Sequence, residues 1–148
     1  MTKHGTILLV EDGNDVVFTR KAFAEAEVHN PLHVVHSGEE AVKYLSGQGK
    51  FADRAAHPLP ALVLLDLTMP GEGGFSVLRW LFERPGLRKR FTVIALGAAD
   101  PNSEIQLAYE MGAQSYLVKP ANSQQWAMTV RRVKEYWIEL NRLLESAA

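Results

Sequence analysis

The chain has 148 residues, a formal net charge of −1, 47% hydrophobic residues and no cysteine. This length suits one globular domain with one core, which we expect to span residues 1–148. Without cysteine there is no disulfide framework, thiol nucleophile or thiolate metal site. The balanced charge gives no general attraction to nucleic acid, and no stretch reaches the roughly eighteen apolar residues of a membrane span. Because a signal-peptide pattern is also missing, we expect a cytoplasmic protein with no nucleic-acid or membrane partner.

Short runs rich in apolar residues alternate along the chain with segments of helical spacing. The short runs predict five strands, in chain order residues 6–10, 32–35, 61–66, 91–96 and 115–118. The segments with helical spacing predict five helices, from residue 14 or 15 to 27, from the N-cap Ser37 to Gly47, and at 73–82, 101–111 and 123–145. Residues 50–60 are polar and interrupted by prolines, which predicts a surface loop. This order predicts an α/β fold, a doubly wound parallel sheet with helices on both faces.

Charged residues collect at the carboxyl ends of the predicted strands. Glu11 and Asp12 follow the first strand, Asp66 ends the third, and Lys119 follows the fifth. Because ligands of open α/β sheets bind beyond the carboxyl ends of the strands, we expect these side chains in one pocket. A single acid at a strand end is more often a helix cap or a solvated loop residue. The combination instead favours a Mg²⁺ site, in which a carboxylate flanked by the metal and a lysine would accept a phosphoryl group.

Three motifs at these strand ends occur in a distinctive order. They are Val10-Glu11-Asp12, residues 64–71 (Leu-Leu-Asp-Leu-Thr-Met-Pro-Gly) and residues 115–120 (Ser-Tyr-Leu-Val-Lys-Pro). Together they resemble the receiver domain of bacterial two-component response regulators, and the resemblance covers nearly the whole chain. The loop before the third strand and the ending Glu135-Tyr136-Trp137 are most similar to stand-alone regulators paired with phytochrome-type histidine kinases. The resemblance implies a flavodoxin-like sheet with strand order 2-1-3-4-5.

The resemblance also implies a role for each matching residue. Asp66 would accept the phosphoryl group from a kinase phosphohistidine, and Lys119 would pair with that group. Asp12 would bind Mg²⁺ directly, together with Asp66, and Glu11 would bind it through water. The backbone carbonyl of Thr68 would be a further ligand to the metal.

Gly97 departs from the pattern of the family. Receivers normally carry Thr or Ser at this position, and the hydroxyl of that residue binds a phosphoryl oxygen. Tyr116 matches the aromatic residue that moves inward on activation, although an exposed aromatic residue on an edge strand is an equally good interpretation. We expect Asp66 to be phosphorylated while the coupling from phosphate to Tyr116 is weakened or bypassed. Receivers also commonly carry a cis peptide bond at the position of Lys119-Pro120.

The last predicted helix is longer than the sheet that it covers. Residues 123–145 would extend about 35 Å, whereas strands are commonly about 17 to 20 Å long. Apolar residues along this helix are spaced alternately by four and three, as in a coiled coil: Trp126, Val130, Val133, Trp137, Leu140 and Leu144. We expect this stripe to form a homodimer interface. Packing of the helix on its own domain is the alternative.

The leading hypothesis is a stand-alone response regulator that signals by docking a partner or by changing its dimer, and that is not an enzyme. The alternative is a pseudo-receiver, an interaction module with constitutive output, which Gly97 suggests. A phosphatase with Asp66 as nucleophile would need a second acid where Thr68 stands. In a flavin-binding protein, Glu11 and Asp12 would repel the flavin phosphate. The basic cluster at residues 84–90 lacks a recognition helix and does not favour DNA binding.

Overall fold

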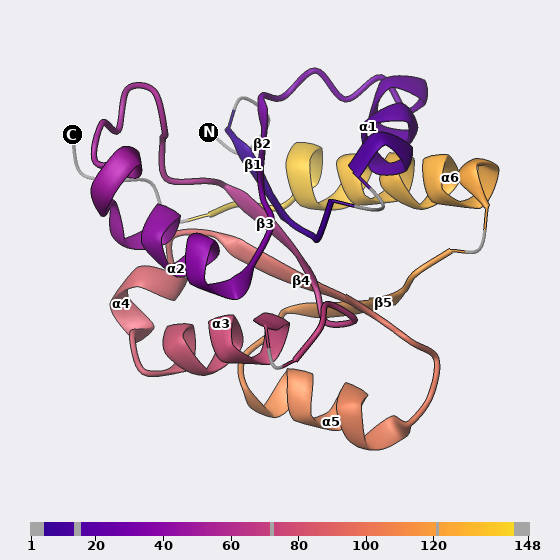
Figure 1. Cartoon of the computed structure of the whole chain (residues 1–148). Helices are drawn as coiled ribbons and strands as arrows, with labels where there is room; N and C mark the ends of the chain where they lie inside the picture. Colours follow the sequence, from indigo (N-terminus) through magenta and orange to yellow (C-terminus); the bar gives the residue numbers. More distant parts are fainter. Residues whose placement is uncertain (1–4, 14–15, 72, 121, 144–148) are drawn as a thin grey trace.

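The computed structural model describes residues 5–13, 16–71, 73–120 and 122–143. A five-stranded parallel sheet forms its centre, with the order β2-β1-β3-β4-β5, which confirms the predicted topology (Figure 1). The strands are β1 (Ile7–Val10), β2 (Leu32–Val35), β3 (Leu62–Asp66), β4 (Thr92–Gly97) and β5 (Ser115–Val118).

Helices cover both faces of the sheet, as predicted. They are α1 (Val16–Glu25), α2 (Gly38–Ser46), α3 (Gly73–Phe82), α4 (Pro85–Arg88), α5 (Asn102–Glu110) and α6 (Ser123–Val133). Helices α1 and α6 lie on one face, and α2 and α3 lie on the other (Figure 1). Ser37 accepts the N–H of Glu40 as the N-cap of α2, and Gly47 ends that helix in the left-handed conformation. Within the described residues no helix is long and apolar enough to span a membrane.

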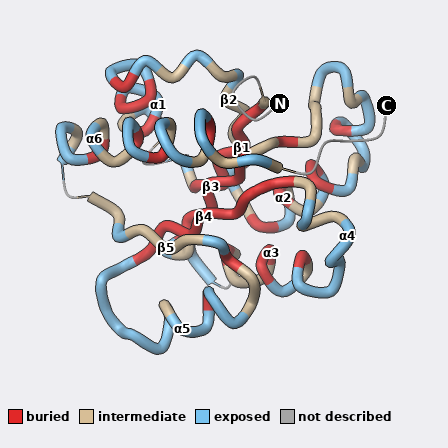
Figure 2. Tube along the Cα trace, turned by 180° about the vertical axis from the view of Figure 1, so that it is seen from behind, coloured by how far each residue is buried: buried red, intermediate tan, exposed pale blue. Residues whose placement is uncertain are grey.

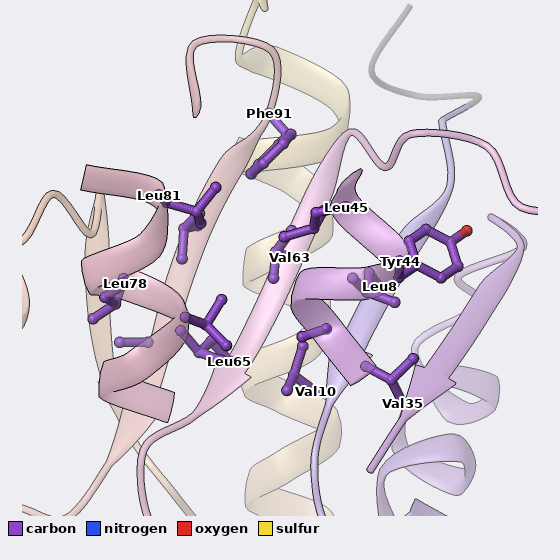
Figure 3. Packing of buried hydrophobic residues seen from close by; sticks show 14 of the residues in the cluster. Leu8, Val10, Val35, Tyr44, Leu45, Val63, Leu65, Leu78, Leu81 and Phe91 are labelled. Atoms are coloured by element: carbon purple, nitrogen blue, oxygen red, sulfur yellow. The ribbon is translucent and has the colours of Figure 1, made fainter. Parts of the chain in front are cut away.

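Alternating strand residues divide the core into two layers. Leu8 and Val10 point with Val63 and Leu65 toward α2 and α3 (Figure 3), whereas the residues between them point toward α1 and α6. Buried residues are concentrated along β1, β3 and β4, the three inner strands (Figure 2). Each fully buried aliphatic side chain stabilises the fold by about 1.5 to 3 kcal/mol. The inner strands are therefore well-packed supports for the residues at their carboxyl ends.

The segment predicted as a surface loop is partly buried. It contains a 3₁₀ turn, η2 (Gly49–Phe51), and Phe51 is only 5% exposed. The ring of Phe51 lies 5.1 Å from that of Tyr44 and 5.2 Å from that of His57. The Tyr44 hydroxyl also donates to the carbonyl of Pro58 at 2.9 Å. The prediction of a surface loop is confirmed for residues 52–59, which are irregular and exposed or half-buried, and is wrong for Phe51, whose ring packs against Tyr44 of α2.

The structure differs from the sequence prediction at Pro85 and at Pro120. Pro85 lies beyond the end of α3 and also begins a short helix that was not predicted, α4, because proline fits the first turn of a helix. Within the described residues the cis peptide bond is Asp100-Pro101, and the expected cis bond before Pro120 is not found.

The C-terminal helix ends earlier than predicted and changes its geometry. A π-helical segment, η3 (Lys134–Leu140), follows α6, and Asn141 already has extended backbone. A π turn holds more residues than an α turn, so the side that faces the core shifts along the chain. Ile138 is buried, whereas Trp137 is only partly buried. The predicted helix over 123–145 is thus corrected to helical structure that ends at Leu140.

The proposed dimer stripe changes character along this helix. Trp126, Val130 and Val133 are at most 7% exposed and pack against α1 and the sheet, so they are not available to a second copy of the chain. Leu140 is 69% exposed, and Leu144 lies outside the described residues. The dimer prediction is wrong for the first three residues, because α6 buries their side chains in its own domain.

Candidate functional site

Asp66 lies at the end of the central strand β3 and is 2% exposed. Its Oδ2 accepts a charged hydrogen bond from Lys119 Nζ at 3.0 Å. Its Oδ1 accepts from the Thr68 backbone N–H at 2.7 Å and from the Thr68 hydroxyl at 2.6 Å. A buried carboxylate is stable only when it is paired and hydrogen-bonded, and these donors also fix its orientation. The structure therefore holds one carboxylate in a defined position at the sheet edge.

Lys119 reaches this carboxylate because its backbone is fixed at the end of β5. Its N–H donates to the carbonyl of Gly97 at 2.9 Å, which ties the ends of β4 and β5 together. Pro120 keeps the preceding backbone out of the helical region, so the chain stays extended as it leaves the sheet. The sequence predicts Asp66 and Lys119 in one pocket, and the structure brings the two side chains together at 3.0 Å.

Glu11 and Asp12 lie beside Asp66 because β1 and β3 are neighbours. Val10 pairs in register with Leu65, so the residues that follow them are level at the sheet edge. Glu11 is 1% exposed, and its Oε2 accepts the Thr19 hydroxyl at 3.2 Å. Asp12 is partly exposed. Of the two acids that follow β1, Glu11 is thus buried and Asp12 is accessible to solvent.

The donor chemistry at this edge fits Mg²⁺. Asp12 and Asp66 offer carboxylate oxygens and Thr68 offers a carbonyl, and hard oxygen ligands are those that Mg²⁺ prefers. In the part of the chain that the structure describes, no three His, Cys, Asp or Glu side chains form a ready metal cluster. Mg²⁺ does not require one, because it usually keeps several waters and takes one or two carboxylates with a phosphate oxygen.

Tyr116 occupies the space beside Gly97. A Cβ built at Gly97 would overlap the Tyr116 hydroxyl and ring, so no other residue fits there unless the tyrosine moves. The Tyr116 hydroxyl donates to the carbonyl of Ala98 at 2.7 Å. Burial, with a smaller contribution from the charge of Glu104, raises the pKa of Tyr116. The missing side chain at the end of β4 is therefore replaced by an aromatic ring from β5.

Residues 7–131 match the response regulator receiver domain family. The chain belongs to this family. It is similar to the crystal structure of RPA3017, a response regulator in red light signaling of R. palustris. The two share 36% identity and a TM-score of 0.88 over 95% of this chain and 99% of that one. It is also similar to a phosphorylated cyanobacterial phytochrome response regulator, RcpA, with 31% identity and a TM-score of 0.84 over 96% and 99% of the two chains. A third similar structure is the Mn²⁺-bound form of Rcp1, a response regulator of Synechocystis sp., with 28% identity and a TM-score of 0.80 over 95% and 99%.

The sequence did not reveal several polar contacts of this receiver. The Thr68 hydroxyl donates a hydrogen bond to Asp66, whereas the family resemblance implies a role for the Thr68 carbonyl alone. Thr19 binds Glu11 from the inner face of α1, and Trp126 donates its indole N–H to Thr19 at 3.1 Å. A threonine on the otherwise apolar face of a predicted helix was the available signal, since a buried hydroxyl needs a partner. The coiled-coil spacing instead predicts Trp126 at a dimer interface and gives no indication of this contact.

Proposed function

We propose that this receiver is a stand-alone response regulator that takes a phosphoryl group from a histidine kinase onto Asp66 in a Mg²⁺-dependent reaction. The observation that carries the proposal is the buried Asp66 carboxylate with the Lys119 ammonium at 3.0 Å, beside the two acids that follow β1. The protein would signal through its phosphorylated surface and would not turn over a substrate as an enzyme does.

The transfer would form one bond and break one. An oxygen of Asp66 attacks phosphorus, the N–P bond of the kinase phosphohistidine breaks, and its electron pair returns to the imidazole nitrogen. Lys119 compensates the negative charge on the phosphoryl oxygens from the side opposite the acids. Thr68 keeps the carboxylate in place through its two hydrogen bonds. Bound Mg²⁺, held by Asp12, Asp66 and the Thr68 carbonyl and through water by Glu11, would neutralise further charge on the group.

A phytochrome-type histidine kinase is the partner class that we propose. Its support is the likeness over nearly the whole chain to RPA3017, from red light signaling, and to the phytochrome response regulator RcpA. The exchange would take place in the cytoplasm.

The proposal is tested by incubating the protein with acetyl phosphate and Mg²⁺ and measuring its intact mass. We expect the mass of one added phosphoryl group, and we expect complete loss of this gain in Asp66→Asn, which keeps the shape of the side chain. Omitting Mg²⁺ should greatly reduce the gain. An unmodified mass under these conditions would contradict the proposal and would favour the pseudo-receiver alternative.

We further propose a homodimer formed through the η3 segment. Tyr136 and Leu140 are 52% and 69% exposed, and large exposed apolar side chains close together are typical of interaction sites. Leu140→Glu should convert a dimer to a monomer in sedimentation. Leu107→Glu on α5, where the leucine is 40% exposed, is the matched control and should leave the dimer intact. A monomeric unmodified protein, or a dimer that survives Leu140→Glu, would contradict this interface.

A further inference from the structure

A chain of buried hydrogen bonds joins the acidic pocket to α6. The Trp126 indole Nε1 donates to Thr19 Oγ1 at 3.1 Å, and Thr19 Oγ1 donates to Glu11 Oε2 at 3.2 Å. All three residues are at most 4% exposed. They come from β1's end, from α1 and from α6, and Trp126 lies 107 residues from Thr19 in the sequence. The contact is therefore made by the tertiary fold and not by local chain geometry.

The direction of this chain is fixed by chemistry. An indole N–H can only donate a hydrogen bond, so Thr19 must be the acceptor toward Trp126. The Thr19 hydroxyl has a single proton, which is directed at the carboxylate of Glu11. Hydrogen bonds in such a series polarise one another, and a carboxylate is the strongest acceptor at its end. A change in the position of Glu11 would therefore change the hydrogen bond that the Trp126 indole N–H donates.

We propose that Thr19 and Trp126 are positioning residues of the metal site, which hold Glu11 in place and carry the state of the acidic pocket to α6. This inference rests on the proposed function, because it assumes that the pocket binds Mg²⁺. We call this connection from Glu11 through Thr19 and Trp126 to α6 the relay. It would link the acidic pocket to the exposed η3 segment without involving Gly97 or Tyr116. Partners of direct metal ligands commonly change metal affinity by about 10- to 100-fold when they are lost, and because Glu11 acts through water we expect an effect at the lower end of this range.

The first test is titration of the protein with Mg²⁺ alone, without a phosphoryl donor, by calorimetry. Thr19→Val keeps the shape of the side chain and removes both hydrogen bonds, and we expect about 10-fold weaker Mg²⁺ binding. Thr19→Ser keeps the hydroxyl and should bind Mg²⁺ almost as the unmodified protein does. Equal affinity in the valine variant would overturn the positioning role.

The second test follows the Trp126 indole N–H directly by ¹H–¹⁵N NMR, with its signal assigned by Trp126→Phe. We expect saturating Mg²⁺ to shift the Trp126 signal and to leave Trp80, on the other face of the sheet, unchanged. In Thr19→Val the shift should disappear even at saturation, and in Thr19→Ser it should remain. A purely structural role would lower stability without removing the shift, so its persistence in the valine variant would overturn the relay.

The outcomes separate this inference from the function on which it rests. If the unmodified protein does not bind Mg²⁺, both fail. If it binds Mg²⁺ and Thr19→Val binds it equally well, the positioning role of Thr19 and Trp126 fails and the proposed function stands. Should the valine variant not fold, as judged by its NMR spectrum, the Mg²⁺ affinity of Trp126→Phe decides: we expect it to be weakened, and an unchanged affinity would contradict the positioning role.

Discussion

The two halves of the sheet's carboxyl edge are built in different ways. Around β1 and β3 the edge is polar, with Asp66 held by Lys119 and Thr68 and with Glu11 buried beside it. At the end of β4 there is no side chain, and Tyr116 covers Gly97. Under the proposed function the first half would carry out phosphoryl transfer, whereas the second lacks the hydroxyl that would bind the transferred group. The proposal therefore predicts that accepting phosphate and responding to it depend on different residues.

Removing the cation from the polar half should have the largest effect after Asp66→Asn. We expect Lys119→Gln to slow phosphorylation by acetyl phosphate about 100-fold, the usual cost of losing a charge-stabilising donor. The rate is measured by intact mass against time. Lys89→Gln, in which an exposed lysine changes in the same way, is the control and should react normally. An undiminished rate in Lys119→Gln would remove the distinction between the two halves.

Restoring a side chain at the end of β4 tests the other half. Gly97→Ala and Gly97→Thr should both displace Tyr116 and lower the free energy of unfolding by about 1 to 3 kcal/mol, as overpacking does. Phosphorylation of Asp66 should continue in both variants. Only the threonine adds a hydroxyl, so a phosphate-dependent change at Tyr116 that appears with threonine and not with alanine would identify the missing group. Unchanged Tyr116 signals in both variants would contradict the steric account.

A smaller effect is expected from removing only the hydroxyl that holds Tyr116. Tyr116→Phe loses the bond to Ala98 and should lower the free energy of unfolding by about 0.5 to 1.5 kcal/mol in urea denaturation. Tyr136→Phe changes an exposed tyrosine and should have almost no effect. If the two variants are equally stable, the inner position of Tyr116 does not depend on this bond.

The smallest effect concerns pH. Because burial raises the pKa of Tyr116, the folded state favours the neutral phenol. Its contribution to stability is full below the ordinary tyrosine pKa of 10.0 and is lost as the pH rises above that value. A ¹³Cζ titration should show Tyr116 ionising above the ordinary tyrosine pKa of 10.0, and Gly97→Thr should remove this rise. Ionisation of Tyr116 at the ordinary value in the unmodified protein would mean that its hydroxyl is not held in a buried position.

The sequence was sufficient for the parts that follow from strand order. Asp66 and Lys119 come together because each lies at the end of a parallel strand, and apolar runs predict those strands directly. Contacts that depend on side-chain placement were not predictable. The π geometry of η3 is one example, since it buries Ile138 and leaves Leu140 exposed where a regular repeat predicts a continuous stripe.

The surroundings of Gly97 likewise could not be predicted from the sequence. The residue's type predicts the loss of a hydroxyl, but only the fold shows that Tyr116 takes the vacated space. Likewise, Thr19 and Trp126 meet because α1 and α6 pack together on one face of the sheet. A threonine on an apolar helix face indicates that its hydroxyl has a buried partner, but nothing in the sequence identifies Trp126 as that partner.

The most direct test combines both halves in one sample. The intact mass and the ¹³Cζ signal of Tyr116 are measured before and after addition of acetyl phosphate and Mg²⁺, with Gly97→Thr providing the signal of a displaced tyrosine. We expect the added mass of one phosphoryl group and a Tyr116 signal that stays in place. No gain in mass, or a gain accompanied by movement of the signal to the displaced position, would contradict it.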